Sequence, residues 1–337
     1  MQNRKVFFSV LVLVPVIIIF TAVTALTFLS AVPDEVTELN VRLSWFHQAQ
    51  FAGMYVAKDN GYYTSKNLEV VFKEYESGVD QITELENGAV DFTIISAREY
   101  LQTIDDGSQL IALGAVYQTS PYALIALEDS GISSPLDFTG KRLGRKGGSE
   151  ASLLVYNALL SRFEIDPLSV DYISLDFSQA EWQELEANTV DVIDLYRTDQ
   201  VYLFEQEEID YNLIKPEDHG FSAYGDIIVT RRSFAEENQT LVENFMKETV
   251  RGWNFALDNQ ELAVEIILPY TSDDYNDTDY QAFILAQSEG LIRPQDNRGV
   301  GVMNFLSWNK TYQQMTAAGL IDASVDIAEV YTNSFLH

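Results

Sequence analysis

The chain has 337 residues, of which 47% are hydrophobic, so it is long enough for one or two domains with a sizeable core. Its formal net charge of -30 excludes the basic surface that binding to nucleic acid requires. The absence of cysteine excludes disulfides, thiolate metal sites and a cysteine nucleophile, and the three histidines lack metal-ligand spacing. We therefore expect no nucleic-acid partner, metal or cofactor.

The N-terminal segment is strongly apolar and carries no charge between residues 6 and 33. A membrane span needs about 20 such residues, whereas the apolar part of a signal peptide has about 7–15. Arg4 and Lys5 precede the segment, which favours a cytoplasmic tail at residues 1–5. We predict a single membrane anchor at 6–33 with the remaining chain outside the cell membrane, periplasmic or extracellular. The alternative, a cleaved signal sequence, exports the same residues.

The first part of the predicted exported region reads as strand, turn, helix and strand. Residues 39–43 alternate between apolar and polar, which is typical of a strand, and residues 68–72 predict a second one. Apolar residues at helical spacing follow Phe51, and Gly61 is a suitable helix stop. Ligands of open α/β sheets bind at the carboxyl ends of strands, which is where the turn at residues 45–50 falls.

This turn combines a flat apolar side chain with polar ones. Trp45 offers an indole face, and His47, Gln48 and Gln50 offer hydrogen-bond donors and acceptors. Such a set suits a planar, polar heterocycle, and we count Phe51 with it as a candidate contact. The alternative is that Trp45 and Phe51 belong to the core while the glutamines cap the helix.

Residues 45–63 form the sequence motif Trp-x-His-Gln-x-Gln-Phe-Ala-Gly-x-Tyr-x-Ala-x-x-x-Gly-Tyr-Tyr. This stretch closely resembles the opening of the NMT1/THI5-like (SsuA/THI5) family of ABC-transporter substrate-binding proteins. The resemblance implies an α/β, two-lobed periplasmic-binding-protein (type II) fold with a ligand cleft between the lobes. Family members bind thiamine-pyrimidine precursors, sulfonates or riboflavin-like ligands, and several pass them to ABC importers.

The next elements alternate in the same way. A helix is predicted at 78–88, a buried strand at 90–95 and a further strand at 109–117. Ser96 begins the intervening helix directly after the buried strand, so it is a candidate ligand contact.

An internal repeat suggests how many lobes the chain forms. Residues 84–95 and 184–195 share five of twelve positions, and each segment reads as a helix end, a tight turn and a strand beginning Val-Asp. An offset of 100 residues is too long for a solenoid repeat and corresponds to about one lobe. We predict that residues 38–120 and 227–337 form lobe 1 and residues 121–226 form lobe 2.

Lobe 2 is predicted to begin with a strand at 122–127, whose first residue, Tyr122, is a candidate contact. A short helix at 134–140, a strand at 141–144 and a helix from Ser149 to about Phe163 follow.

The start of this last helix is a second candidate ligand loop. Gly148 allows close approach of the backbone, Ser149 is a good N-cap, and Glu150 could accept hydrogen bonds from a ligand amino group. The family resemblance implies ligand contacts at the matching loop. The loop lacks the P-loop pattern, and the alternative is an ordinary capped helix.

Two further aromatic or acidic residues complete the predicted site. Tyr196 follows the strand predicted at 190–195 and is a plausible second stacking wall opposite Trp45. The turn at 196–200 resembles a Tyr-x-Thr-Asn-Glu-type turn of the family, from which Asp199 and Gln200 depart. Asp226 lies on the strand that returns to lobe 1, at the predicted cleft. The other predicted elements are strands at 170–175, 211–215 and 225–230 and helices at 179–186, 203–208, 238–257, 261–268, 279–290 and 304–318.

These features favour a non-catalytic solute-binding protein that delivers a thiamine-type aminopyrimidine, or a similar aromatic heterocycle, to an ABC permease. Riboflavin-like ligands stay open, and a sulfonate is disfavoured because the predicted cleft holds more acids than bases. A sensory input module for a signalling partner is a second hypothesis, because the same motif resembles extracytoplasmic domains that are fused to histidine kinases and cyclases. An enzyme is disfavoured, since the resemblance implies that fungal relatives use a cysteine-rich motif that this chain lacks.

Overall fold

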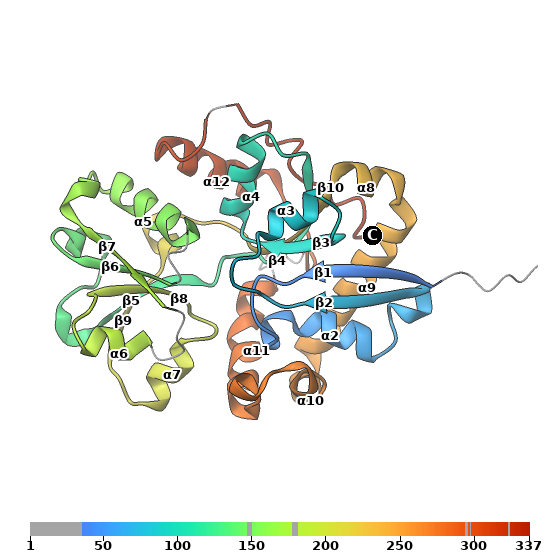
Figure 1. The fold of residues 1–337 in the computed structure, drawn as a ribbon, viewed down its shortest axis with the longest axis horizontal. Helices are drawn as coiled ribbons and strands as arrows, with labels where there is room; N and C mark the ends of the chain where they lie inside the picture. The colour runs from blue at the N-terminus through green and yellow to red at the C-terminus, as the bar shows by residue number, and fades with distance from the viewer. Residues whose placement is uncertain (1–35, 147–149, 177–180, 294–295, 297, 323) are drawn as a thin grey trace, which may run out of the picture.

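Short apolar strands and amphipathic helices alternate along the chain and build two lobes, each around a five-stranded sheet (Figure 1). The computed structural model describes residues 36–146, 150–176, 181–293, 296, 298–322 and 324–337. The predicted anchor at 6–33 lies outside these residues. Within them, no helix combines the length and apolar character needed to cross a bilayer.

The sheet of the first lobe is mixed and has the order β2-β1-β3-β10-β4. β1 runs parallel to β2 and β3, whereas β10 pairs antiparallel with β3 and β4. Every residue of β4 is buried, which explains its nearly continuous apolar sequence. Its strands are β1 (Thr37–Arg42), β2 (Leu68–Lys73), β3 (Phe92–Ile95), β4 (Leu110–Tyr117) and β10 (Gly225–Arg231).

The second lobe repeats this plan with the order β7-β6-β8-β5-β9. β6 runs parallel to β7 and β8, and β5 pairs antiparallel with β8 and β9. Its strands are β5 (Tyr122–Leu127), β6 (Arg142–Lys146), β7 (Asp171–Leu175), β8 (Val192–Tyr196) and β9 (Tyr211–Ile214). The prediction of two lobes of similar α/β plan is confirmed.

The repeated sequence segments occupy equivalent places in the two sheets. Asp91 accepts a hydrogen bond from the backbone N–H of Asn40 on β1 at 2.8 Å. Asp191 accepts one from the backbone N–H of Arg142 on β6 at 2.7 Å. The aspartate before β3 is therefore bonded to the neighbouring strand β1, and the aspartate before β8 is bonded to β6. The repeat has the same structural role in both lobes.

The helices pack on both faces of the sheets (Figure 1). One helix, α8, was not predicted; it ends at Asn238, whose non-helical backbone separates it from α9. The helices are α2 (Ala52–Asp59), α3 (Gln81–Glu86), α4 (Ala97–Asp105), α5 (Glu150–Arg162), α6 (Glu181–Glu186), α7 (Val201–Gln206), α8 (Arg232–Glu237), α9 (Gln239–Asp258), α10 (Gln260–Ile267), α11 (Thr278–Ile292) and α12 (Phe305–Ala317).

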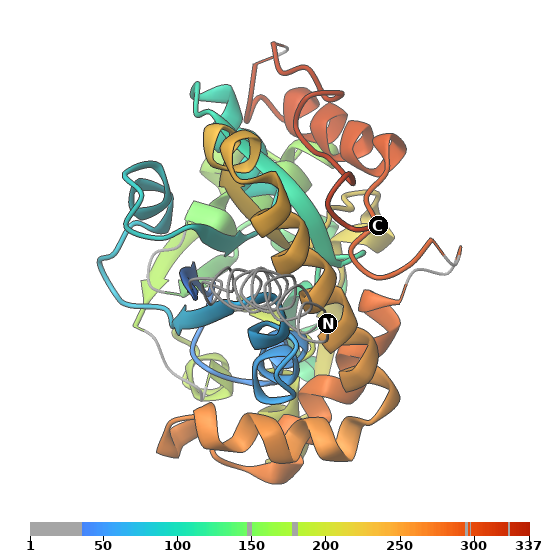
Figure 2. The ribbon, with the colours of Figure 1, turned by 90° about the vertical axis from the view of Figure 1, so that its right-hand side faces the viewer.

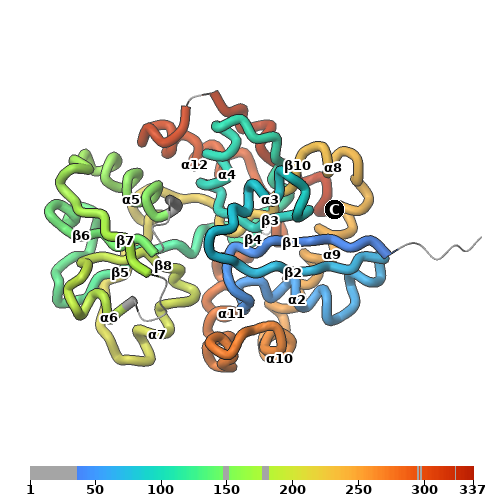
Figure 3. The backbone as a smooth tube through the Cα atoms, viewed as in Figure 1, coloured from blue at the N-terminus to red at the C-terminus, as the bar shows by residue number. Residues whose placement is uncertain are grey.

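Two segments carry the chain between the lobes, one from β4 to β5 and one from β9 back to β10 (Figure 3). The segments contact each other, because the backbone N–H of Ser120 donates to the carbonyl of Ala223 at 2.9 Å. A Cβ atom at Gly225 would lie 2.8 Å from Pro121, so the crossing requires a residue without a side chain. The two crossing segments are therefore held together at the place where the chain passes from one lobe to the other.

Helices α2 and α9 lie in direct backbone contact on the first lobe, where α9 crosses the lobe diagonally (Figure 2). A Cβ atom at Gly252 would lie 2.0 Å from the carbonyl oxygen of Gly53, and one at Gly53 would lie 2.2 Å from the ring of Trp253. Because α2 follows the turn at residues 45–50, this contact fixes the position of the turn.

Substituting Gly252→Ala should destabilise the protein by about 1–3 kcal/mol or more, which is the usual cost of overpacking a well-filled core. Gly290→Ala in α11 is the matched control, because a Cβ atom there meets nothing within 4 Å. The control should be neutral or slightly stabilising, since alanine is the better helix former. Thermal unfolding of both variants tests this, and equal melting temperatures would contradict the close contact.

Candidate functional site

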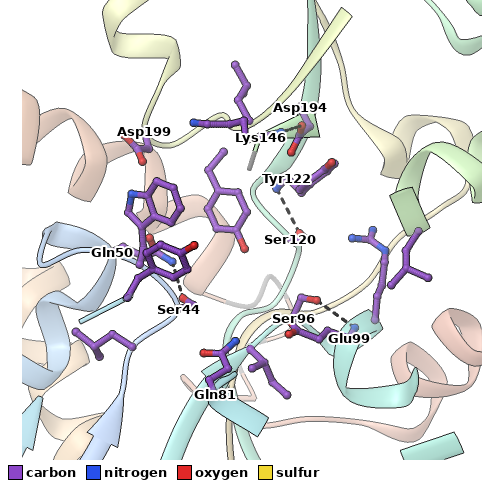
Figure 4. Close-up of a pocket in the computed structure, with 18 of the residues that line it drawn as sticks. Ser44, Gln50, Gln81, Ser96, Glu99, Ser120, Tyr122, Lys146, Asp194 and Asp199 are labelled. Atoms are coloured by element: carbon purple, nitrogen blue, oxygen red, sulfur yellow. Dashed lines mark hydrogen bonds between the residues drawn. The ribbon is translucent and has the colours of Figure 1, made fainter. Parts of the chain in front are cut away.

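A cavity of about 420 Å³ lies between the lobes (Figure 4). This volume falls within the range of roughly 300–1,000 Å³ that is usual for small-molecule sites. Residues from both sheets line it, because the carboxyl ends of β1, β3, β6 and β8 all meet there. Its lining includes Ser44, Trp45, Gln50, Gln81, Ser96, Arg98, Glu99, Gln102, Tyr122, Lys146, Asp194, Tyr196 and Asp199.

Five of the side chains predicted from sequence lie together around this cavity: Trp45, Gln50, Ser96, Tyr122 and Tyr196. Trp45 is half-buried and stacks on Tyr75, with ring centroids 5.6 Å apart. The rings of Tyr122 and Tyr196 meet edge to face at 6.4 Å on the other lobe. Aromatic surface therefore reaches the cavity from both lobes.

A cation of the second lobe faces the indole of Trp45. The Nζ atom of Lys146, the last residue of β6, lies 5.5 Å from the centre of that ring. Lys146 also donates its backbone N–H to Asp194 on the neighbouring strand β8 at 3.3 Å. The direct sandwich of a ligand between Trp45 and Tyr196 stays a prediction.

Three residues of the same stretch do not line the cavity. Phe51 is 2% exposed and belongs to the core. The Nδ1 atom of His47 lies 2.7 Å from the hydroxyl of Tyr55, and burial lowers the pKa of the imidazole, so it is neutral at neutral pH. Gln48 is fully buried behind Gln50. These three side chains pack into the protein interior and fix the turn there, while Trp45 and Gln50 line the cavity.

A buried carboxylate of the second lobe, Asp199, connects the two lobes. It accepts hydrogen bonds from Gln48 Nε2 at 3.2 Å, from Gln200 Nε2 at 2.7 Å and from the hydroxyl of Tyr280. Gln48 and Tyr280 belong to the first lobe and lie 151 and 81 residues away in the sequence. Sequence reasoning missed this contact, since no local pattern relates residues so far apart.

Asp226 supports Gln50 from outside the cavity. Its Oδ2 atom accepts a hydrogen bond from Gln50 Nε2 at 2.7 Å, and Gln50 in turn accepts one from Gln48 at 2.9 Å. Asp226 is 1% exposed and has a left-handed backbone with φ of 42°. Burial raises the pKa of its carboxyl to about 7, and the hydrogen bond from Gln50 lowers it in part. Asp226 therefore orients the amide of Gln50.

A family model described as NMT1/THI5 like matches residues 48–263. The chain belongs to this family. The match starts inside the turn of the first lobe and includes the whole second lobe, so it spans both walls of the cavity.

Three relatives with assigned roles cover most of this NMT1/THI5-like chain. The riboflavin-binding protein RibY of Chloroflexus aurantiacus is 25% identical over 304 residues, covering 89% of this chain and 86% of its own length. The formylaminopyrimidine-binding protein of Halalkalibacterium halodurans is 20% identical and covers 71% and 72%. A 4-amino-5-hydroxymethyl-2-methylpyrimidine phosphate synthase of Legionella pneumophila is 24% identical and covers 91% and 94%. The relatives thus include two binding proteins and one enzyme.

The fold is also that of solved substrate-binding proteins. The alkanesulfonate-binding protein SsuA from Xanthomonas axonopodis pv. citri, bound to MOPS, superposes with a TM-score of 0.66 at 15% identity, covering 88% of this chain and 99% of that one. The prediction of a two-lobed α/β periplasmic-binding-protein fold is confirmed.

The predicted loop before α5 is described only in part. Gly148 and Ser149 lie outside the described residues, and Glu150 is the first residue of α5. Near this loop, sequence reasoning missed Asp194, which accepts a hydrogen bond from Ser152 at 2.7 Å and whose pKa burial raises. A single acid inside the apolar run of β8 was the signal that could have found it.

Metal ligands are not grouped in the part of the chain that the structure describes. Within it, no cluster of three or more histidine, cysteine, aspartate or glutamate side chains could hold an ion. Two carboxylates at the cavity instead accept hydrogen bonds from uncharged groups, Asp199 from the amide of Gln48 and Asp194 from the hydroxyl of Ser152.

The pKa of Asp226 predicts a specific pH dependence of stability. The folded protein holds a proton on this carboxyl up to about pH 7, whereas the ordinary value is 3.8. Between these two values the folded state binds more protons than the unfolded state, so this group's stabilising contribution is full below pH 3.8 and falls as pH rises to about 7.

Asp226→Asn should remove this dependence, because asparagine can still accept the hydrogen bond from Gln50 and tolerates a left-handed backbone. The melting temperature of the variant relative to wild type should therefore increase between about pH 4 and pH 7 and then level off. Thermal unfolding across this range measures the difference, and a constant offset would show that the carboxyl titrates normally.

Proposed function

We propose that this chain is a non-catalytic solute-binding protein that holds a small planar nitrogen heterocycle in the inter-lobe cavity and delivers it to an ABC permease. The observation that carries the proposal is the position of Trp45. It lies at the carboxyl end of β1, partly exposed to a cavity whose opposite wall contains Tyr122 and Tyr196. Aromatic side chains supply large, rigid contact surfaces for a flat ring.

The charges that line the cavity support a ligand without negative charge. Five carboxylates reach it, Glu76, Asp80, Glu99, Asp194 and Asp199, against three cations, Arg42, Arg98 and Lys146. Arg42 is already paired with Glu84 at 2.7 Å. An anionic ligand such as a sulfonate would therefore meet an excess of like charge.

The relatives support the same class of ligand. Riboflavin and formylaminopyrimidine, which two of the relatives are named for, are both planar nitrogen heterocycles. The relative named as a synthase makes turnover a result to test directly. Mass spectrometry of whatever co-purifies with the protein identifies the ligand, and conversion of that ligand by the purified protein would contradict a purely binding role.

The apolar N-terminal segment supports a location of the protein at the cell membrane. We propose that residues 6–33 tether the protein to the cell membrane, with both lobes outside, so that a bound solute reaches the permease at the same membrane.

Trp45→Ala should weaken heterocycle binding about tenfold or more, because it removes the stacking surface and the apolar area that a ring would bury. Since Trp45 is half-buried, the fold should persist. Phe305→Ala is the matched control, because this aromatic residue is 47% exposed at the start of α12 and does not line the cavity. Calorimetric titration with aminopyrimidines and flavins measures the loss, and unchanged affinity for every ligand that binds would exclude Trp45 as the platform.

A further inference from the structure

We propose that the ligand carries a hydroxylated arm and that one face of α4 binds this arm. The inference rests on the proposed function, because it describes the remainder of a ligand whose ring stacks on Trp45. It separates two ligand classes that the proposed function leaves together: a heterocycle with a polyhydroxyl side chain, and a pyrimidine with only small substituents.

The geometry of α4 supports an elongated polar subsite. Ser96, Glu99 and Gln102 follow one another at three-residue intervals, so they lie on one face of the helix, and all three line the cavity. From the N-cap to Gln102 this face extends about 9 Å at a rise of about 1.5 Å per residue. Figure 4 shows Ser96 and Glu99 beside Gln81, on a different wall from Ser44 and Gln50. None of these side chains is aromatic, so the wall offers hydrogen bonds along a line and no stacking surface.

The hydrogen-bonding capacity of this face is only partly used. Ser96 Oγ accepts the backbone N–H of Glu99 at 3.2 Å, which leaves its own hydrogen to donate. The carboxyl of Glu99 interacts with Gln81, and burial raises its pKa because the carboxylate is poorly solvated. The side-chain amide of Gln102 makes no hydrogen bond within the described part of the chain.

Helix α4 also supplies a buried donor to the cavity. Arg98 lines the same cavity at 4% exposure; it donates to the carbonyl of Phe221 at 3.2 Å and packs on the ring of that residue. Its Nε atom is buried and has no hydrogen-bond partner among the described residues. Burial lowers the pKa of the guanidinium to about 10, which still leaves it charged at neutral pH. An unpaired buried N–H of this kind costs free energy unless a ligand oxygen accepts it.

The combination selects hydroxyl groups over charged groups. A phosphate or carboxylate arm would satisfy Arg98 but face the carboxylate of Glu99, and an ammonium arm would do the reverse. A hydroxyl can donate to the carboxylate of Glu99 or accept from the guanidinium of Arg98, so an arm with several hydroxyls suits both groups. A pyrimidine with small substituents would leave most of this face without a partner.

The experiment compares riboflavin with lumiflavin, which has the same ring system but a methyl group in place of the ribityl chain. Calorimetric titration of the full-length protein should show riboflavin binding at least tenfold more tightly, which corresponds to about one hydrogen bond to a charged group. Glu99→Leu should weaken riboflavin binding about tenfold and leave lumiflavin binding unchanged. Gln102→Ala, at a partly exposed position, should act in the same direction and provides a second variant should Glu99→Leu unfold. Glu237→Leu, on the exposed surface of α8, is the matched control and should change neither affinity.

The outcomes separate the arm from the ring. Equal affinities for the two flavins, or equal losses for both in the Glu99 and Gln102 variants, would overturn the hydroxylated arm. Binding of 4-amino-5-hydroxymethyl-2-methylpyrimidine without binding of either flavin would also overturn it, while the proposed function would stand. Failure of all three compounds and of further planar heterocycles to bind would remove the proposed function itself.

Discussion

The relation between the two lobes depends on the buried carboxylate of Asp199. A carboxylate that is 2% exposed is stable only where donors replace its lost hydration. Among its donors, Gln200 is local to the second lobe, but Gln48 and Tyr280 come from the first. Moving the lobes apart would remove both of the first-lobe donors together, so the observed arrangement is one in which this carboxylate is stabilised by both lobes. The volume of the cavity and the facing of Lys146 onto Trp45 follow from that arrangement.

The same contact explains how the turn at residues 45–50 is constructed. Gln48 links Asp199 to Gln50, and Gln50 continues to Asp226, so a chain of side-chain hydrogen bonds runs from the second lobe to β10. Each residue of the chain is less than 9% exposed, and such buried networks fix side-chain orientation because an unpaired member is costly. The turn therefore has two layers. Its buried residues hold the lobes and orient the amide of Gln50, and only its outer residues are available to a ligand.

The strands were predictable from sequence because the apolar pattern that marks each one also determines its burial. Every strand lies within two residues of its predicted bounds, and the repeat correctly indicated two similar lobes. The lining of the cavity was predictable where a residue lies at or shortly after the carboxyl end of a strand, as for Trp45, Ser96 and Tyr196. It was not predictable where the contact depends on how one lobe faces the other. Gln48 and His47 look equally exposed in a polar turn, yet one bonds across the lobes and the other packs on Tyr55.

The position of Lys146 sets the energetic condition for any ring that binds on Trp45. Its ammonium contributes a cation–π contact of about 0.5–2 kcal/mol with the indole, similar in size to the stacking that a ligand would gain. A ring that displaced the ammonium into an apolar environment would therefore gain little. The neighbouring carboxylate of Asp194 changes this balance, because β6 and β8 are adjacent strands and Asp194 already accepts the backbone N–H of Lys146. The Lys146 ammonium already stabilises the carboxylate of Asp194, so a ring that stacked on Trp45 could displace the ammonium from the indole while both charges stayed compensated.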